Sequence, residues 1–180
     1  MLDNVTDDIL IVRILKGDVQ AFKLLVERYQ DMVFTIACRI THNREEAEEV
    51  GQDVFLKVYN NLKGFEGTAK FSSWIYRITY NTALTKIRNR REENKPIENA
   101  RADNANIAVY NEAEQGFTRE DLNMAINQLE PEEASIITLF YLLEQSLEEI
   151  AVVMNIETNA AKVRLFRARK KLREKMELIN

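Results

Sequence analysis

Apolar residues recur every three or four positions along the chain, which places them on one side of successive α-helices. The pattern predicts a first helix that begins near Thr6 and ends at Gly17, after which Asp18 caps a longer second helix. Asn43 and Glu46 fit a capping box at the start of a third helix, whose apolar positions are Ala47, Val50, Val54, Val58 and Leu62. Five glycines and two prolines are few for a chain that turns between many strands, so the sequence predicts an all-α fold.

Residues 92–117 differ from the rest of the chain in being acidic, polar and weakly periodic, and Pro96 interrupts any helix there. This segment is predicted to be a flexible acidic linker with a short helical turn around residues 107–110. Two small helical domains are therefore expected, residues 1–91 and residues 118–180.

The C-terminal domain is predicted to contain four helices. One runs from Thr118, and the next has Pro131 in its first turn and the apolar positions Ala134, Ile137, Phe140 and Tyr141. Ser146 and Glu149 then fit a capping box, and the helix that they open ends at Asn155, a residue type that tolerates the left-handed backbone of a tight turn. The last helix has the apolar positions Ala161, Leu165, Ala168 and Leu172.

The remaining faces of that last helix are basic and carry Lys162, Arg164, Arg167, Arg169, Lys170 and Lys171. A solvated amphipathic helix also has a charged outer face, but it mixes both signs to form lateral ion pairs. Two helices joined by a tight turn, the second one basic, are typical of a helix-turn-helix. Its second helix lies in the major groove of DNA while its cations neutralise phosphates, so DNA binding is the favoured interpretation.

A loop rich in glycine leads into a second stretch that combines aromatic and basic residues, 71–91. Its predicted inner face consists of Phe71, Trp74, Ile75 and Ile78, whereas the residues around or beside it are Lys70, Tyr76, Arg77, Tyr80, Asn81, Lys86, Arg88, Arg90 and Arg91. An aromatic cluster at helical spacing is usually part of a core, and Trp74 is expected to be mostly core. The same residue types also bind single-stranded DNA, because bases stack on rings while cations follow the backbone.

The net charge of −4 does not argue against nucleic acid, because its distribution is uneven. Residues 92–117 contain two cations and six anions, which accounts for the whole imbalance. Residues 162–175 contain eight cations and one anion. The local field, rather than the total charge, attracts a polyanion.

Cysteine and histidine occur once each, which leaves no intramolecular disulfide and no Cys/His set for zinc. Cys38 lies in an apolar helix and is expected to be a small buried residue, and His42 is expected to lie in a helix junction. No apolar run is long enough to span a bilayer, and the acidic N-terminus is unlike a secretory signal. The expected location is the cytoplasm, with no direct membrane insertion.

Four blocks of the sequence, in this order and spacing, resemble an extracytoplasmic-function (ECF) sigma factor of bacterial RNA polymerase. The block GDVQAFKLLVERYQDMVF resembles the opening of sigma domain 2, and AEEVGQDVFLKVYNNL resembles the helix that docks on the polymerase clamp. The block FEGTAKFSSWIYRITYNTALTKIRNRR resembles the region that melts and binds the minus-ten element. The last block, LEPEEASIITLFYLLEQSLEEIAVVMNIETNAAKVRLFRARKKL, resembles sigma domain 4.

The resemblance implies three sets of binding residues. Contacts with core polymerase, through its beta and beta-prime subunits, would come from Glu49, Gln52, Asp53, Phe55 and Lys57. Capture of an extruded minus-ten base on the single strand would use Phe65, Lys70, Phe71, Ser72, Trp74, Arg77 and Asn81. The duplex minus-thirty-five element would be read by Thr158, Asn159, Lys162, Val163, Arg164, Phe166, Arg167 and Arg169.

Several positions depart from the pattern of the family. Asn155 stands where many relatives have glycine, Glu157 replaces a usual serine cap, and Val163 replaces a frequent serine. The recognition helix is therefore expected to begin at Thr158, and Glu157 to repel phosphate. Thr85 occupies a place where relatives often have aspartate. These departures suggest that the promoter sequence is not transferable from relatives.

The resemblance also implies an initiation factor without catalytic residues, cofactor or metal, restrained by an anti-sigma factor. Two other functions remain open from the residues. An ordinary helix-turn-helix regulator would bind DNA without polymerase. A recombinase or transposase would need a nucleophilic serine or tyrosine, or clustered carboxylates for metal ions, whereas the acidic residues here are spread over capping and solvent-facing positions.

Overall fold

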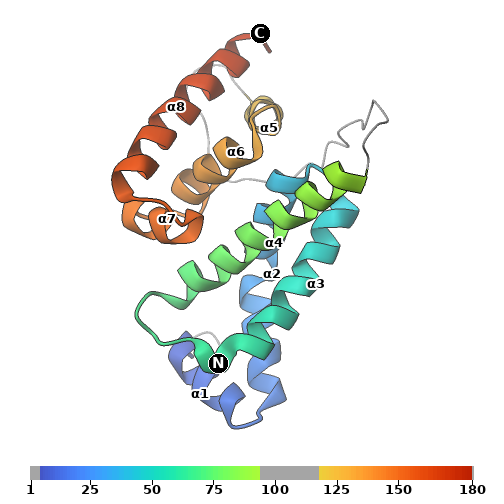
Figure 1. Cartoon of the computed structure of the whole chain (residues 1–180), viewed down its shortest axis with the longest axis vertical. Helices are drawn as coiled ribbons and strands as arrows, with labels where there is room; N and C mark the ends of the chain where they lie inside the picture. Colours follow the sequence, from blue (N-terminus) through green and yellow to red (C-terminus); the bar gives the residue numbers. More distant parts are fainter. Residues whose placement is uncertain (1–4, 94–117, 180) are drawn as a thin grey trace.

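The computed structural model describes residues 5–93 and 118–179, and within these ranges all regular structure is helical. Two groups of helices are visible in Figure 1, one in blue to green and one in yellow to red. The first group contains α1 (Asp7–Leu15), α2 (Val19–Thr41), α3 (Arg44–Asn61), the short η1 (Leu62–Gly64) and α4 (Phe71–Glu93). The second contains α5 (Arg119–Asn127), α6 (Pro131–Ile137), η2 (Thr138–Leu142), α7 (Leu147–Met154) and α8 (Thr158–Glu177). The predicted linker turn around residues 107–110 lies outside the described residues.

The first group is built on α2, α3 and α4, each of which packs against the other two, and the apolar stripe of α3 lies within this contact. All five of its predicted positions are buried: Ala47, Val50, Val54, Val58 and Leu62. The Asp18 side chain accepts hydrogen bonds from the backbone of Gln20 and Ala21, and it caps α2 as predicted. Because burial of apolar surface dominates folding, this three-helix contact holds the group together.

The predicted capping box at Asn43 is only half formed. The Asn43 side chain accepts the N–H of Glu46 at 3.0 Å, and it caps α3. The Glu46 carboxylate does not complete the box, because it accepts a hydrogen bond from Arg90 of α4 at 2.9 Å. A tertiary ion pair has therefore replaced the local interaction, and it links the start of α3 to the end of α4.

The second group begins each of its first three α-helices with a reciprocal capping box. Thr118 with Asp121 opens α5, Glu130 with Glu133 opens α6, and Ser146 with Glu149 opens α7 as predicted. Pro131 occupies the first turn of α6. Tyr141 was predicted to lie on an apolar stripe, but it is 46% exposed. The reason is that α6 continues into the wider π-helical turn η2, which changes the direction of the side chain. The Tyr141 ring lies under the Arg169 guanidinium.

Cys38 is 3% exposed, as expected for a small core residue, and burial raises the pKa of its thiol to about 11. His42, at the junction of α2 and α3, has a left-handed backbone. Its pKa is lowered by burial and by the nearby Arg39 and Arg90 cations.

Alkylation of Cys38 is expected to be very slow in the folded protein. The thiolate is the reactive form, and at pH 8 a raised pKa reduces its fraction by roughly 200-fold relative to an unfolded thiol. Iodoacetamide labelling at pH 8, followed by mass spectrometry, should therefore be at least about 100-fold slower in buffer than in 6 M urea. Similar rates under both conditions would show that the thiol is open to solvent.

The two groups of helices contact each other. α4 packs against α7, and α2 packs against α6. In Figure 1, one side of α4 faces the second group of helices. Between them, Arg39 of α2 is 1% exposed and donates hydrogen bonds to Asn127 at 2.8 Å and to Asn123 at 2.6 Å, both on α5. The arrangement of the two domains is thus defined by a buried polar contact as well as by packing.

Candidate nucleic-acid interface

α7 and α8 form the predicted helix-turn-helix. Asn155 ends α7 with φ 54° and ψ 52°, the left-handed conformation that the turn requires. α8 begins at Thr158, as predicted from the departure at Glu157. Glu157 stands at the N-cap of α8 without a side-chain hydrogen bond. Ala161, Leu165 and Ala168 are buried against the neighbouring helices, which turns the opposite face of α8 outward.

The eight predicted minus-thirty-five residues all belong to α8, and we call them the recognition surface. Phe166 is 71% exposed, an unusual position for a large aromatic ring that has no binding role. Val163 is also exposed, whereas Arg164 is half-buried. The other five members are exposed: Thr158, Asn159, Lys162, Arg167 and Arg169.

Two carboxylates of α6 pair with cations of α8. Glu132 accepts a hydrogen bond from Arg164 at 2.5 Å, and Glu133 accepts one from Lys171 at 2.5 Å. The bond to Glu133 raises the pKa of Lys171. These pairs orient α8 on α6, and they also neutralise part of its charge, so the side chains of the recognition surface do not contribute equally to its positive field.

The predicted minus-ten residues lie in the loop before α4 and in its first two turns, except Asn81, which lies further along the helix. We call this set the strand surface: Phe65, Lys70, Phe71, Ser72, Trp74, Arg77 and Asn81. Three of them form a ring cluster, with centroids 5.4 Å apart for Phe65 and Phe71, 5.3 Å for Phe65 and Trp74, and 5.5 Å for Phe71 and Trp74. Phe71 is buried, while Phe65 and Trp74 are partly buried, so Trp74 is less of a core residue than expected. Lys70, Arg77 and Asn81 are exposed.

Two tyrosines of α4 were expected to lie outside the inner face, but the structure buries both. Tyr76 is 4% exposed and packs edge-on against Tyr29, and burial raises the pKa of Tyr76 to about 12. Tyr80 is also 4% exposed, and burial together with Glu132 of the second domain raises its pKa to about 12. They are therefore packing residues in this arrangement, and neither ring is presented to a nucleic-acid strand.

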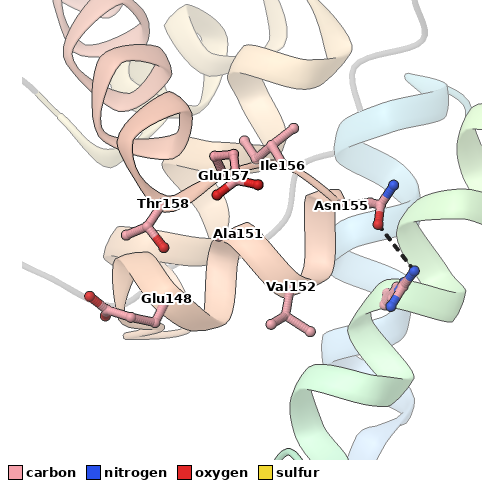
Figure 2. Close-up of a pocket in the computed structure, with 8 residues that line it drawn as sticks. Glu148, Ala151, Val152, Asn155, Ile156, Glu157 and Thr158 are labelled. Atoms are coloured by element: carbon pink, nitrogen blue, oxygen red, sulfur yellow. Dashed lines mark hydrogen bonds between the residues drawn. The ribbon is translucent and has the colours of Figure 1, made fainter.

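An open cavity of about 730 Å³ lies where the helix-turn-helix meets α4. Arg77 lines one side, and Glu148, Asn155, Glu157 and Thr158 line the other. Figure 2 shows the Asn155 side chain directed toward α4, where its amide oxygen accepts a hydrogen bond from Arg77 at 3.3 Å.

The predicted polymerase-contacting residues lie along α3, and we call them the docking surface. Glu49, Gln52, Asp53 and Lys57 are exposed, whereas Phe55 is partly buried against the core. Glu49 forms an ion pair with Lys86 of α4, and Lys57 donates a hydrogen bond to Thr82 at 3.0 Å. The structure thus brings the docking surface and α4 into direct contact.

Two apolar residues of α3 were missed by the sequence analysis. Leu56 is 62% exposed and Tyr59 is 51% exposed, next to the docking surface. Both are large apolar residues at positions outside the buried stripe of α3. An apolar residue at such a position is the sequence signal that could have identified them. Their exposure gives this face the mixed apolar and charged character of a protein interface.

Within residues 5–93 and 118–179, no group of three or more His, Cys, Asp or Glu residues is placed to hold a metal ion. No helix in the same ranges combines the length and the apolar content needed to cross a bilayer. Within the described residues, a helical fold with a cationic helix-turn-helix and an aromatic–basic surface on a second domain is typical of DNA-binding proteins.

Comparison with known proteins agrees with this class. The model of sigma-70 region 2 matches residues 25–93, and that of sigma-70 region 4 matches residues 119–172. The RNA polymerase sigma-H factor of Pseudomonas aeruginosa is 32% identical over 182 residues, covering 94% of this chain and 93% of the relative. The ECF RNA polymerase sigma-E factor of Haemophilus influenzae is 31% identical over 187 residues, covering 98% of each.

The fold is also that of a solved structure, the sigma factor RpoE in complex with the anti-sigma factor NepR from Bartonella quintana. The TM-score is 0.70 at 21% identity, over 88% of this chain and 98% of that one. The chain belongs to the ECF sigma factors of the sigma-70 family. The resemblance seen in its sequence is confirmed, and its function is that of a sigma factor in transcription initiation.

Proposed function

We propose that the chain docks on core RNA polymerase through α3, holds the separated minus-ten strand at the start of α4 and reads the minus-thirty-five duplex with α8. In this proposal residues 1–91 form the domain for polymerase and single-stranded DNA, and residues 118–180 form the domain for duplex DNA. The observation that carries it is that three surfaces of different chemistry lie on separate helices of one chain.

The docking surface suits a protein partner. Leu56 and Tyr59 supply apolar area, and the neighbouring Gln52 and Asp53 supply a polar rim. Interfaces commonly combine a small apolar centre with such a rim, where charges select the partner and its orientation. We infer that the beta-prime and beta subunits of core polymerase contact this face.

The strand surface suits an unpaired base. Phe65 and Trp74 are partly buried, so their rings are fixed by packing and still offer an edge or face to a ligand. Extruding a base costs a few kcal/mol of stacking, and stacking on protein rings together with backbone contacts from Lys70 and Arg77 would offset this cost.

The recognition surface suits the major groove. Arg167 and Lys162 would contact phosphates or guanine edges, and Phe166 would contact thymine methyl groups. Glu157 precedes this helix in place of a neutral cap and would weaken a phosphate contact there. The promoter sequence would therefore be particular to this chain.

The proposal assigns no bond chemistry to the chain, because core polymerase supplies the catalytic metal ions and active site. Cys38 is buried with a raised pKa, so the thiol is not available as a nucleophile. We place the protein in the cytoplasm, where polymerase acts. By analogy with the Bartonella quintana complex, we also propose an anti-sigma partner that covers its binding surfaces.

Promoter-directed transcription with purified core polymerase tests the proposed function. Core polymerase plus this chain should produce transcripts with defined start sites from genomic DNA fragments, whereas core alone should produce only unspecific products. Failure to initiate at any sequence would contradict the proposal. Sequence-specific DNA binding by the chain alone, without association with core, would favour a free-standing helix-turn-helix regulator instead.

A further inference from the structure

The aromatic rings of the strand surface pack on a ring from another helix. Tyr29 of α2 is 6% exposed, and its ring lies edge-on to Phe71, the first residue of α4, with centroids 5.5 Å apart. Phe71 in turn contacts both Phe65 and Trp74, the two partly buried rings of that surface. Tyr29 therefore supports the one ring that contacts both of the others.

The hydroxyl of Tyr29 fixes the position of its ring. It donates a hydrogen bond at 2.5 Å to Oδ2 of Asp7, the first residue of α1. Oδ1 of the same carboxylate accepts a hydrogen bond from Arg28, and Arg28 also donates one to the Val5 carbonyl at 2.6 Å. Each carboxylate oxygen thus has its own donor, which orients Asp7. Burial and then the bond to Asp7 raise the pKa of Tyr29, so its hydroxyl stays protonated as a donor at neutral pH.

The helix α1 reaches the strand surface by a second route. It packs against η1, the turn that leads directly into Phe65. Its buried apolar residues Leu10, Ile11 and Ile14 attach it to the core. The polar bond at the start of α1 is therefore available to orient the Tyr29 ring rather than to hold the helix in place.

The position of these rings affects how strongly a base can stack on them. A gap of about 0.5–1 Å already forfeits about a quarter to a half of the dispersion attraction between two atoms. Edge-to-face ring pairs also have a preferred geometry, so a shift of one ring moves its neighbours. The geometry of Phe65 and Trp74 thus depends on that of Phe71, and the geometry of Phe71 depends on Tyr29.

We propose that Tyr29 is a positioning residue for strand capture: its hydroxyl, held by Asp7, sets the position of Phe71 and thereby that of the rings on which an extruded base stacks. Tyr29 itself touches no DNA, because its ring is buried. The proposal rests on the proposed function, since it requires the strand surface to bind an unpaired base. It gives the start of α1, which belongs to none of the three binding surfaces, a part in strand capture.

The first test observes Trp74 in the free chain. Trp74 is the sole tryptophan of the sequence, so incorporation of fluorotryptophan gives a fluorine NMR signal from this residue alone. Tyr29→Phe keeps the ring and removes the hydroxyl, and it should shift or broaden the signal. Asp7→Ala removes the acceptor of the same bond and should act similarly. The double variant should resemble the stronger of the two single variants, because both break one interaction.

Two control variants separate positioning from general stability. Tyr80→Phe removes the hydroxyl of another buried tyrosine of the same domain, and it should leave the Trp74 signal unchanged. Asp18→Ala removes the cap of α2 and should lower the melting temperature by about 2–8 °C. It should also leave the Trp74 signal unchanged, although it destabilises the same domain.

The second test measures strand capture by the holoenzyme. The probe is a fluorescent single-stranded oligonucleotide that carries the melted strand of a promoter at which the unaltered holoenzyme initiates. The Tyr29→Phe holoenzyme should bind it about 3- to 10-fold more weakly, because displaced rings lose part of the stacking of one base. Its affinity for the minus-thirty-five duplex should be unaltered, and Asp18→Ala should change neither affinity.

An unchanged Trp74 signal in Tyr29→Phe would overturn the proposal. So would an equal loss of oligonucleotide and duplex affinity, or an equal effect of Asp18→Ala, since either result would indicate a purely structural role. Failure of the unaltered holoenzyme to initiate or to bind the oligonucleotide would instead overturn the proposed function. The NMR test does not depend on that function, so the two failures are distinguishable.

Discussion

Core RNA polymerase is expected to bind the Asp53→Arg chain about 30- to 1,000-fold more weakly than the unaltered chain. Asp53 is exposed in the middle of the docking surface. On the proposed assignment, a reversed charge there would face a partner surface complementary to the original carboxylate. Juxtaposed like charges at an interface cost several kcal/mol, and each 1.4 kcal/mol is a factor of about ten. The measurement is fluorescence anisotropy of the labelled chain titrated with purified core polymerase.

The matched control is Asp31→Arg, which makes the same charge change at an exposed position of α2. It should bind core polymerase with unaltered affinity. Both variants should keep their thermal stability, since surface substitutions usually change the free energy of unfolding by less than about 0.5 kcal/mol. Equal binding by Asp53→Arg and Asp31→Arg would remove α3 from the polymerase interface.

Replacing Arg167 with alanine is expected to weaken binding to the minus-thirty-five duplex by about 5- to 150-fold. A single arginine contact with DNA is worth about 1–3 kcal/mol, and loss of one phosphate contact lowers the slope of log affinity against log salt concentration by about one. Arg164→Ala should have a smaller effect, because Glu132 already neutralises part of that cation. The assay is holoenzyme binding to duplexes selected from a random pool, at several salt concentrations.

Two further variants test whether the effect on duplex binding is specific to the cations of α8. Lys23→Ala removes an exposed cation from α2 and should leave both affinity and salt slope unchanged. Glu132→Gln removes the ion-pair partner of Arg164 and should raise affinity, because the freed cation becomes available to DNA. A larger loss for Lys23→Ala than for Arg167→Ala would place the duplex contact on another face of the protein.

Local signals in the sequence predicted most of the fold. The stripe of α3, the Ser146 capping box and the Asn155 turn depend on residues within one or two helical turns, and all three are present in the structure. Features that depend on contacts between distant helices were not predicted. Glu46 pairs with Arg90 rather than with its own helix end, and Tyr80 is buried beside the second domain.

The burial of Arg39 could not be predicted from the spacing of apolar residues along α2. An arginine on a long amphipathic helix is normally expected to face solvent, and nothing local names Asn123 and Asn127 as its partners. The sequence did contain a weaker indication, since the run Ile36–Ile40 has apolar or small residues at every position except Arg39. Such a run indicates a helix end that is buried on all sides, and residues 36–41 are all buried in the structure.

The side-chain bonds between α3 and α4 have a consequence for the promoter. Arg90 with Glu46, Lys86 with Glu49 and Lys57 with Thr82 join the two helices at three points along their length. On the proposed assignment, one of these helices is anchored to the enzyme and the other to the first unpaired base. The distance from the polymerase clamp to the upstream edge of the transcription bubble is then set by the rigid pair of helices α3 and α4. It does not depend on the DNA sequence between the two promoter elements.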